Sequence, residues 1–290
     1  MRINYAMLAL CLGFWTTSVG AATPAGPPAV FRLDKAGATD GDLARELANL
    51  HKEPDAGLRT QAAAAWFLGL PYQADPLGEA AGKDTDPLYG WDRVDCITLL
   101  EVLLGFVRAD TIDQARETTV QLRYNGQAKA WKNRMHLTLS QWFPAAKKQG
   151  LLADITAKVG GRHVRKGAKR LDKAQSCQGR WRTFCRDMQE HFPAGNYPYT
   201  YLPLEDAVRM AEDIPTGTLV FFLHVPRPAV PYQVFHASVV MRDGPGPATM
   251  VHASRKAKAV VRTGLAAYLK SLDKRYRKWP VAGVILMAPQ

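Results

Sequence analysis

The sequence predicts an α+β fold in which a helical front half precedes a strand-rich back half. Apolar residues recur at helical spacings over 41–52 and 57–68, and the run 97–107 is apolar nearly all round. Four later runs, rich in β-branched and aromatic residues, are separated by Pro- and Gly-rich turns: 218–223, 234–241, 249–254 and 281–287. Helices followed by strands indicate an α+β domain with an antiparallel sheet.

Residues 1–22 have the features of a cleaved secretory signal peptide. Arg2 is basic, residues 7–15 are apolar, and residues 19–22 are small. The apolar stretch is too short to cross a membrane, and the bulky residue before Cys11 disfavours lipidation. We expect a periplasmic or secreted protein with one domain at 23–290 and no transmembrane segment.

The chain carries a formal net charge of +12, which favours an anionic partner. Basic residues are concentrated at 158–173, 255–258 and 274–278. For an exported protein we expect anionic lipid, or the carboxylate-rich peptides of a cell wall, rather than nucleic acid. The alternative is a solvated basic surface without a partner.

Three cysteines follow the signal segment: Cys96, Cys177 and Cys185. In an oxidising compartment an odd number leaves one free thiol. Cys177 and Cys185 could close a small loop and leave Cys96 available for chemistry. In the alternative, all three are reduced and Cys96 is a buried small apolar residue.

Cys96 follows Asp95 and opens the apolar run 97–107, after a Gly-, Asp- and Pro-rich loop that extends through Gly90. A thiol in the first helical turn faces unpaired backbone N–H groups and the positive end of the helix dipole, which both favour the thiolate. Two His-Ala-Ser triplets, at His236 and His252, come later in the chain. The order suggests a cysteine nucleophile followed by a histidine base.

The segment 243–247, Asp-Gly-Pro-Gly-Pro, predicts the turn of a hairpin. Pairing that is symmetric about this turn places His236 opposite Ser254, and Ser238 opposite His252. His236, His252 and Ser254 would then share one face, so either His252 or Ser254 could reach His236. A one-residue bulge would undo this register.

Several segments together carry a resemblance to a known family. In chain order they are Phe67-Leu68-Gly69-Leu70-Pro71-Tyr72, Asp95-Cys96-Ile97-Thr98-Leu99-Leu100-Glu101, Arg123-Tyr124-Asn125-Gly126, Asn133-Arg134-Met135-His136, Tyr201-Leu202-Pro203-Leu204 and the two His-Ala-Ser triplets. With these segments the chain resembles the DUF1460 family, a branch of the NlpC/P60 cysteine peptidase and amidase superfamily that includes N-acetylmuramoyl-L-alanine amidase-like proteins. The stretch 155–200 matches least well and is taken as an insertion. Leu99-Leu100 and Ala237-Ser238 depart from the usual pattern in packing residues only.

The resemblance implies a papain-like NlpC/P60 fold, with the cysteine at the N-terminus of a helix that packs on an antiparallel sheet. It implies that Cys96 is the nucleophile, that His236 is general base and then general acid, and that His252 orients His236. Tyr72 corresponds to a tyrosine that helps to hold the oxyanion in relatives, with an ordinary buried aromatic as the alternative.

The resemblance also draws attention to groups on the substrate side of the site. Arg134 and His136 match a family-specific pair, and a guanidinium there could bind a substrate carboxylate. The alternative is a structural ion pair. Ser254 completes the expected substrate-binding or oxyanion groups.

The function that follows is hydrolysis of an amide bond in peptidoglycan or muropeptides by an exported cysteine amidase. The bond is the lactoyl-to-L-alanine amide or a γ-glutamyl bond further along the stem peptide, and the family favours the first. No metal or cofactor is expected, because there is no His-Glu-x-x-His motif and the seven histidines lack close ligand spacing. The alternatives are a zinc amidase and a non-catalytic protein that binds cell-wall polymer.

Overall fold

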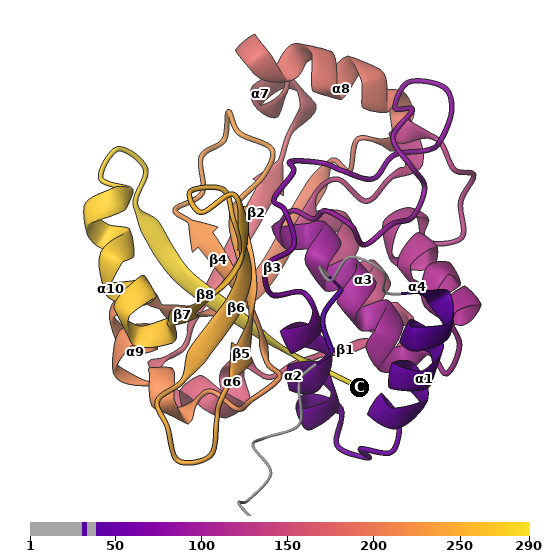
Figure 1. Cartoon of the computed structure of the whole chain (residues 1–290). Helices are drawn as coiled ribbons and strands as arrows, with labels where there is room; N and C mark the ends of the chain where they lie inside the picture. The colour runs from indigo at the N-terminus through magenta and orange to yellow at the C-terminus, as the bar shows by residue number, and fades with distance from the viewer. Residues whose placement is uncertain (1–30, 34–38) are drawn as a thin grey trace, which may run out of the picture. The chain divides into compact units, whose positions relative to one another are not determined.

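The computed structural model describes residues 31–33 and 39–290 (Figure 1). Residues 31–290 form one compact unit of mixed helices and antiparallel sheet, as the predicted α+β class requires. The segment assigned to the signal peptide, with Cys11, lies outside the described residues. Within the described part of the chain, no helix is long and apolar enough to span a membrane.

The helices predicted in the front half are present. The helical elements are α1 (Asp40–Leu50), α2 (Ala56–Trp66), α3 (Cys96–Arg108), α4 (Ile112–Tyr124), α5 (Phe143–Lys148), α6 (Thr156–Gly160), α7 (Lys173–Ser176), α8 (Arg182–Met188), α9 (Leu204–Arg209) and α10 (Leu265–Arg275). Side chains of Thr39 and Asp55 cap the starts of α1 and α2 by accepting backbone N–H groups. Helix α3 is enclosed, with every residue from Thr98 to Val107 buried.

The four predicted strands are present within a larger antiparallel sheet. The strands are β1 (Leu152–Asp154), β2 (Arg165–Leu171), β3 (Gly195–Pro203), β4 (Leu219–His224), β5 (Val234–Met241), β6 (Thr249–Ser254), β7 (Ala259–Gly264) and β8 (Val281–Pro289). Their order is β2-β3-β8-β4-β5-β6-β7, and β1 pairs with β8 beside this path. β1, β2, β3 and β7 were not among the predicted strands.

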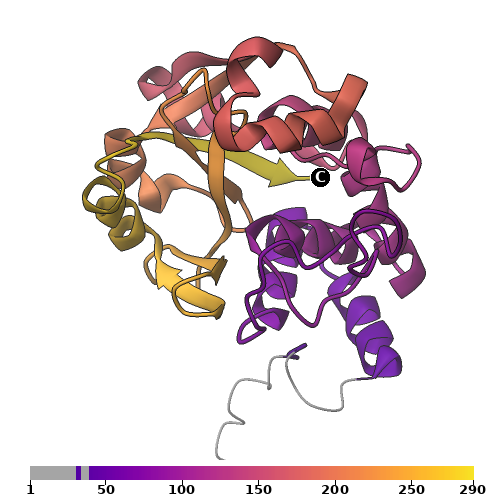
Figure 2. The same cartoon turned by 90° about the horizontal axis from the view of Figure 1, so that it is seen from above.

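Helices cover both faces of this sheet. One face, with Phe221 and Val239, packs against α2 and α3 in the larger core cluster. The opposite face, with Phe222 and Val240, packs against α9 and α10. Figures 1 and 2 show the purple front helices and the yellow α10 on opposite sides of the central strands. Because strand side chains alternate, each strand contributes to both cores.

The stretch 155–200 contains α6, most of a long hairpin and the short helices α7 and α8. β2 and β3 pair from Arg165↔Tyr201 to Leu171↔Gly195, and α7 and α8 lie between these strands in the chain. A disulfide joins Cys177 to Cys185 and closes the small loop considered above. Cys96 is the free cysteine among the described residues.

Candidate active site

Cys96 is the first residue of α3, directly after the N-cap Asp95. Asp95 Oδ1 accepts hydrogen bonds from the N–H groups of Ile97 (3.0 Å) and Thr98 (2.8 Å), and the Thr98 hydroxyl accepts the Asp95 N–H. This reciprocal cap occupies the second and third N–H groups of the helix. The Cys96 N–H is the first N–H of the helix, and the Asp95 cap does not use it.

Tyr72 is held beside Cys96 by backbone hydrogen bonds from two sides. Its N–H donates to the carbonyl of Lys258 at 3.0 Å, at the start of β7. The carbonyl of the preceding Pro71 accepts the N–H of Val94 at 3.1 Å, just before α3. These bonds fix the loop between the sheet edge and α3. They place Tyr72 at the wall of the cavity that contains Cys96.

The two histidines of the His-Ala-Ser triplets are in direct contact. His236 Nε2 lies 2.9 Å from His252 Nδ1, and His252 Nε2 lies 3.2 Å from Thr263 Oγ1 on β7. A consistent set of donors has His236 Nε2–H donating to His252, and His252 Nε2–H donating to Thr263. In this arrangement His236 Nδ1 is unprotonated and can accept a proton.

The hairpin register agrees with the symmetric pairing expected from the sequence. Val239 pairs with Val251, and Val240 pairs with Met250. A one-residue bulge does occur in β5, at Phe235, but it lies beyond His236 from the hairpin turn. The β5–β6 pairs extend from Met241↔Thr249 to Val239↔Val251, on the turn side of both His236 and the bulge.

The bulge also places two successive rings on one face of β5. The rings of Phe235 and His236 both contact Phe222, with centroids 6.3 and 5.6 Å away. A regular strand would point these two neighbouring side chains to opposite faces, and bulges commonly redirect side chains next to active sites.

Tyr268 of α10 lies against both imidazoles. Its ring centroid is 5.8 Å from that of His236 and 5.3 Å from that of His252. The Arg275 guanidinium lies 5.2 Å from the same tyrosine ring. The sequence reasoning missed Thr263 and Tyr268, and it noted Arg275 only as part of a basic cluster. Tyr268 carries no local signal, because its spacing from Leu265, Leu269 and Leu272 is that of any buried helix face.

A cavity of about 850 Å³ brings together Cys96, Tyr72, His236, His252 and Ser254. These residues come from four separate segments: the loop at Tyr72, α3, β5 and β6. The Ser254 hydroxyl accepts the Ala257 N–H at 3.2 Å, within the turn that follows β6. His252, rather than Ser254, is the group that contacts His236.

Burial controls the protonation of the cavity. Crowding by protein atoms, followed by the Asp95 carboxylate, raises the pKa of the Cys96 thiol to about 12. The N–H groups of Ala237, Cys96 and Ile97 lower this pKa, as expected for a helix start, but they do not prevail. The sequence-based expectation of a favoured thiolate is therefore wrong in its net direction for the ligand-free site.

The pKa values of the two imidazoles are lowered, whereas that of the thiol is raised. Burial, then His252 and Arg275, lowers the pKa of His236 to about 3. Burial, then Arg275, lowers the pKa of His252 to about 4. At neutral pH the resting cavity thus contains a neutral thiol and two neutral imidazoles.

Arg134 and His136 do not line this cavity. The Arg134 side chain is 5% exposed and lies 3.0 Å from the Asp84 carboxylate and 3.3 Å from that of Asp75. His136 Nε2 lies 2.7 Å from the Trp131 carbonyl oxygen, and its ring packs on Trp131. These contacts are those of the structural ion pair that the sequence left as the alternative for Arg134.

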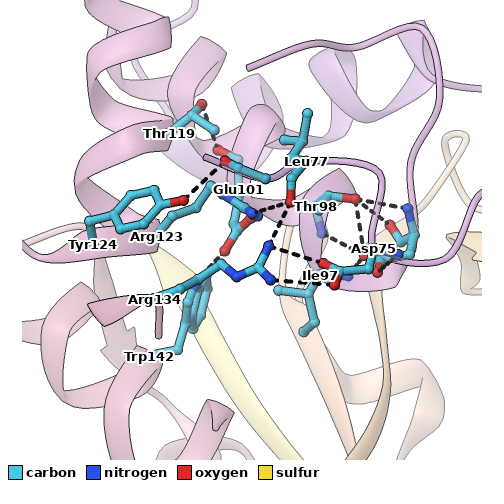
Figure 3. A network of polar contacts seen from close by, with 12 residues as sticks. Asp75, Leu77, Ile97, Thr98, Glu101, Thr119, Arg123, Tyr124, Arg134 and Trp142 are labelled. Atoms are coloured by element: carbon cyan, nitrogen blue, oxygen red, sulfur yellow. Dashed lines mark hydrogen bonds and ion pairs between the residues drawn. The ribbon is translucent and has the colours of Figure 1, made fainter. Parts of the chain in front are cut away.

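A buried polar network connects this arginine region to α3 (Figure 3). Arg123 Nη1 donates to Glu101 of α3 at 2.7 Å, and Arg123 Nη2 donates to the Leu77 carbonyl at 2.6 Å. The Asp75 N–H donates to Asp95 Oδ2 at 3.0 Å. The loop that contains Asp75 and Leu77 is thereby tied to the cap residue beside Cys96. Among the described residues, no group of three or more His, Cys, Asp or Glu side chains is arranged to hold a metal ion.

Comparisons with known proteins agree with this architecture. Residues 62–274 match the family model AmiA-like, described as N-acetylmuramoyl-L-alanine amidase-like. A Legionella pneumophila protein of the DUF1460 family is 18% identical, with 86% of this chain and 94% of that chain covered and a TM-score of 0.73. A Bacteroides uniformis N-acetylmuramoyl-L-alanine amidase is 19% identical, with 81% and 99% covered and a TM-score of 0.64. No curated protein matched the chain. At these identities the two structures show a shared fold.

Proposed function

Since the chain belongs to the AmiA-like family, which is N-acetylmuramoyl-L-alanine amidase-like, we propose that it is an exported cysteine amidase acting on peptidoglycan or muropeptides. The proposal includes a signal peptide at 1–22, a catalytic domain at 23–290 with an insertion near 155–200, and a papain-like NlpC/P60 fold. Its location would be periplasmic or extracellular.

One observation carries the proposal. Cys96 at the start of α3 lines the same cavity as His236 and His252, which are linked to each other at 2.9 Å. A thiol, a base and a group that orients the base are the parts required for nucleophilic acyl transfer. Cys96 is also outside the disulfide, so its sulfur is available.

The proposed first step forms a thioester and releases an amine. The Cys96 thiol gives its proton to His236 Nδ1 while the sulfur attacks the amide carbonyl carbon. We assign the oxyanion to the Cys96 N–H and the Tyr72 hydroxyl; in support, both residues line the cavity, and the cap Asp95 already occupies the next two N–H groups of the helix. His236 then returns the proton to the amide nitrogen, and the C–N bond breaks.

The second step restores the enzyme. His236 Nδ1 accepts a proton from water as the water oxygen attacks the thioester carbonyl. Collapse of the intermediate breaks the C–S bond and releases a carboxylic acid, and the sulfur recovers its proton. His252 and Thr263 keep the Nε2 of His236 engaged, so the same nitrogen serves both steps.

Two amide bonds were considered for cleavage, and we propose the lactoyl-to-L-alanine amide. The family description supports this choice over a γ-glutamyl bond further along the stem. The products would be an intact stem peptide with a free amino terminus and a sugar that retains its lactoyl carboxylate.

Mass spectrometry of purified muropeptides tests the proposal. The mature protein should release the intact stem peptide, and its Cys96→Ala variant should not. Turnover by both would indicate another chemistry, such as that of a zinc amidase or a contaminant. Binding without turnover by either would support the non-catalytic wall-binding alternative.

A further inference from the structure

The charged side chains that line the cavity around Cys96 are all cationic. Its lining includes three cationic side chains, Arg255, Lys256 and Arg275, and no Asp or Glu. Within the described residues, none of these three forms an ion pair with a carboxylate. Other arginines of the same sheet are paired, as Arg242 is with Glu212 at 2.9 Å. Unpaired cations in a concave site favour an anionic ligand.

The cations reach the cavity from two separate elements. Arg255 and Lys256 belong to the turn between β6 and β7, which is shaped by the hydrogen bond from the Ala257 N–H to the Ser254 hydroxyl. Arg275 is the last residue of α10, and its Nη2 donates to Ser271 Oγ at 3.1 Å. A ligand that contacts both elements would lie in the cavity that His236 and His252 also line.

Arg255 and Arg275 each lie near groups of the proposed catalytic site. Burial, Asp95 and Cys96 raise the pKa of the Tyr72 hydroxyl, and Arg255 is near enough to oppose them. Arg275 packs over Tyr268, whose ring contacts both imidazoles. An anion bound between them would therefore lie near the scissile bond.

We propose that Arg255, Lys256 and Arg275 form a carboxylate-binding subsite that takes the free α-carboxylate of the γ-linked glutamyl residue in the stem peptide. The inference rests on the proposed function. A γ-linked glutamyl residue leaves its α-carboxylate unlinked, and it follows the L-alanine of the scissile amide. Two residues span at most about 7 Å, so this carboxylate lies within about that distance of the scissile amide.

The chemistry of the three side chains suits this ligand. Guanidinium groups bind carboxylates in a two-pronged manner, and an ammonium adds a mobile point charge. A carboxylate bound at Arg275 would also offset the positive charge that lowers the pKa of His236 and His252. Binding of the correct stem would thus make His236 a better base.

Calorimetry with the Cys96→Ala protein tests the subsite without turnover. Three muropeptides are compared: the free acid, the form amidated at the glutamyl α-carboxyl, and the form amidated at the stem terminus. We expect glutamyl amidation to weaken binding about ten-fold or more, and terminal amidation to have little effect. Arg275→Gln and Arg255→Gln, each in the Cys96→Ala protein, should weaken binding of the free acid but not of the glutamyl-amidated form.

Lys270→Gln is the matched control, because Lys270 is exposed on α10 and does not line the cavity. It should bind all three muropeptides as the parent does. Equal binding of the free and glutamyl-amidated forms would overturn the subsite while leaving the amidase proposal intact. A loss confined to terminal amidation would overturn the glutamyl assignment. Failure to bind any muropeptide would overturn the proposed function and the subsite with it.

Discussion

His236 Nε2 lies 2.9 Å from His252 Nδ1, and this contact determines which nitrogen of His236 is available for chemistry. When His236 Nε2–H donates to His252 Nδ1 and His252 Nε2–H donates to Thr263 Oγ1 at 3.2 Å, the three side chains form one hydrogen-bond chain along the wall of the cavity. His236 Nδ1 is left as the proton acceptor. Under the proposed function, this hydrogen-bond chain would orient His236 as the third residue of a catalytic triad does, and it is built here from two neighbouring β-hairpins.

Removing the orienting group should damage turnover more than substrate binding. We expect His252→Ala to lower kcat about 10²- to 10⁴-fold with a small change in KM, because His236 loses its fixed orientation. Thr263→Val should lower kcat by roughly ten-fold, and Thr263→Ser, which keeps the hydroxyl, should lose less. Steady-state kinetics on a muropeptide measure these effects. A fall in kcat/KM carried entirely by KM would contradict the orienting role.

The resting thiol provides a second prediction. Because crowding raises the pKa of Cys96 to about 12, its alkylation by iodoacetamide should accelerate from pH 7 to pH 10 without a plateau. Iodoacetamide is uncharged, so the cationic cavity does not bias the result, and Cys177 and Cys185 are protected as a disulfide. The rate is followed by mass spectrometry of the intact protein. A plateau below pH 7 would instead indicate a preformed thiolate–imidazolium pair.

Local patterns were sufficient to predict parts of the fold around this cavity. The periodicity of 97–107 indicated α3, and the Asp-Gly-Pro-Gly-Pro turn was enough to predict how β5 pairs with β6. Thr263 and Tyr268 could not be predicted, because their roles arise only when β7 and α10 pack beside the hairpin. Contacts of this kind join residues that no sequence period relates.

The net direction of the Cys96 pKa shift also could not be predicted from the sequence. The helix start indicated a favoured thiolate, but the opposing effect depends on how many protein atoms surround the sulfur. That number is set by tertiary packing. Arg134 gives a parallel case, since its family match suggested a ligand contact whereas its position beside Asp75 and Asp84 depends on the fold of a distant loop.

The buried ion pair between α3 and α4 should be costly to break. Glu101 and Arg123 are 3% and 4% exposed and lie 2.7 Å apart, and Trp142 Nε1 also donates to Glu101 at 3.2 Å. We expect Glu101→Gln to lower the free energy of unfolding by about 3–5 kcal/mol, because Arg123 would keep a buried charge without its partner. Denaturant titration measures the change. Exposed Glu117→Gln on α4 is the control and should stay within about 0.5 kcal/mol of the parent.

The lowered pKa of His136 leads to a prediction for how the free energy of unfolding depends on pH. Burial, followed by the Arg134 charge, lowers the pKa of His136 from 6.5 to about 3. Between these two values the unfolded chain binds a proton that the folded protein does not, so acidification favours unfolding. The stability is complete above pH 6.5 and declines as the pH falls toward 3, by at most about 1.4 kcal/mol per pH unit for this residue.

His136→Phe isolates this contribution from those of His236 and His252. The phenyl ring retains the packing on Trp131 and Phe184 but cannot take up a proton. It also loses the hydrogen bond to the Trp131 carbonyl, so the informative quantity is the slope of unfolding free energy against pH rather than its value at one pH. We expect a shallower slope between pH 6.5 and pH 4 in the variant. Parallel curves would mean that His136 is protonated as readily in the folded protein as in the unfolded chain, which its burial beside a guanidinium opposes.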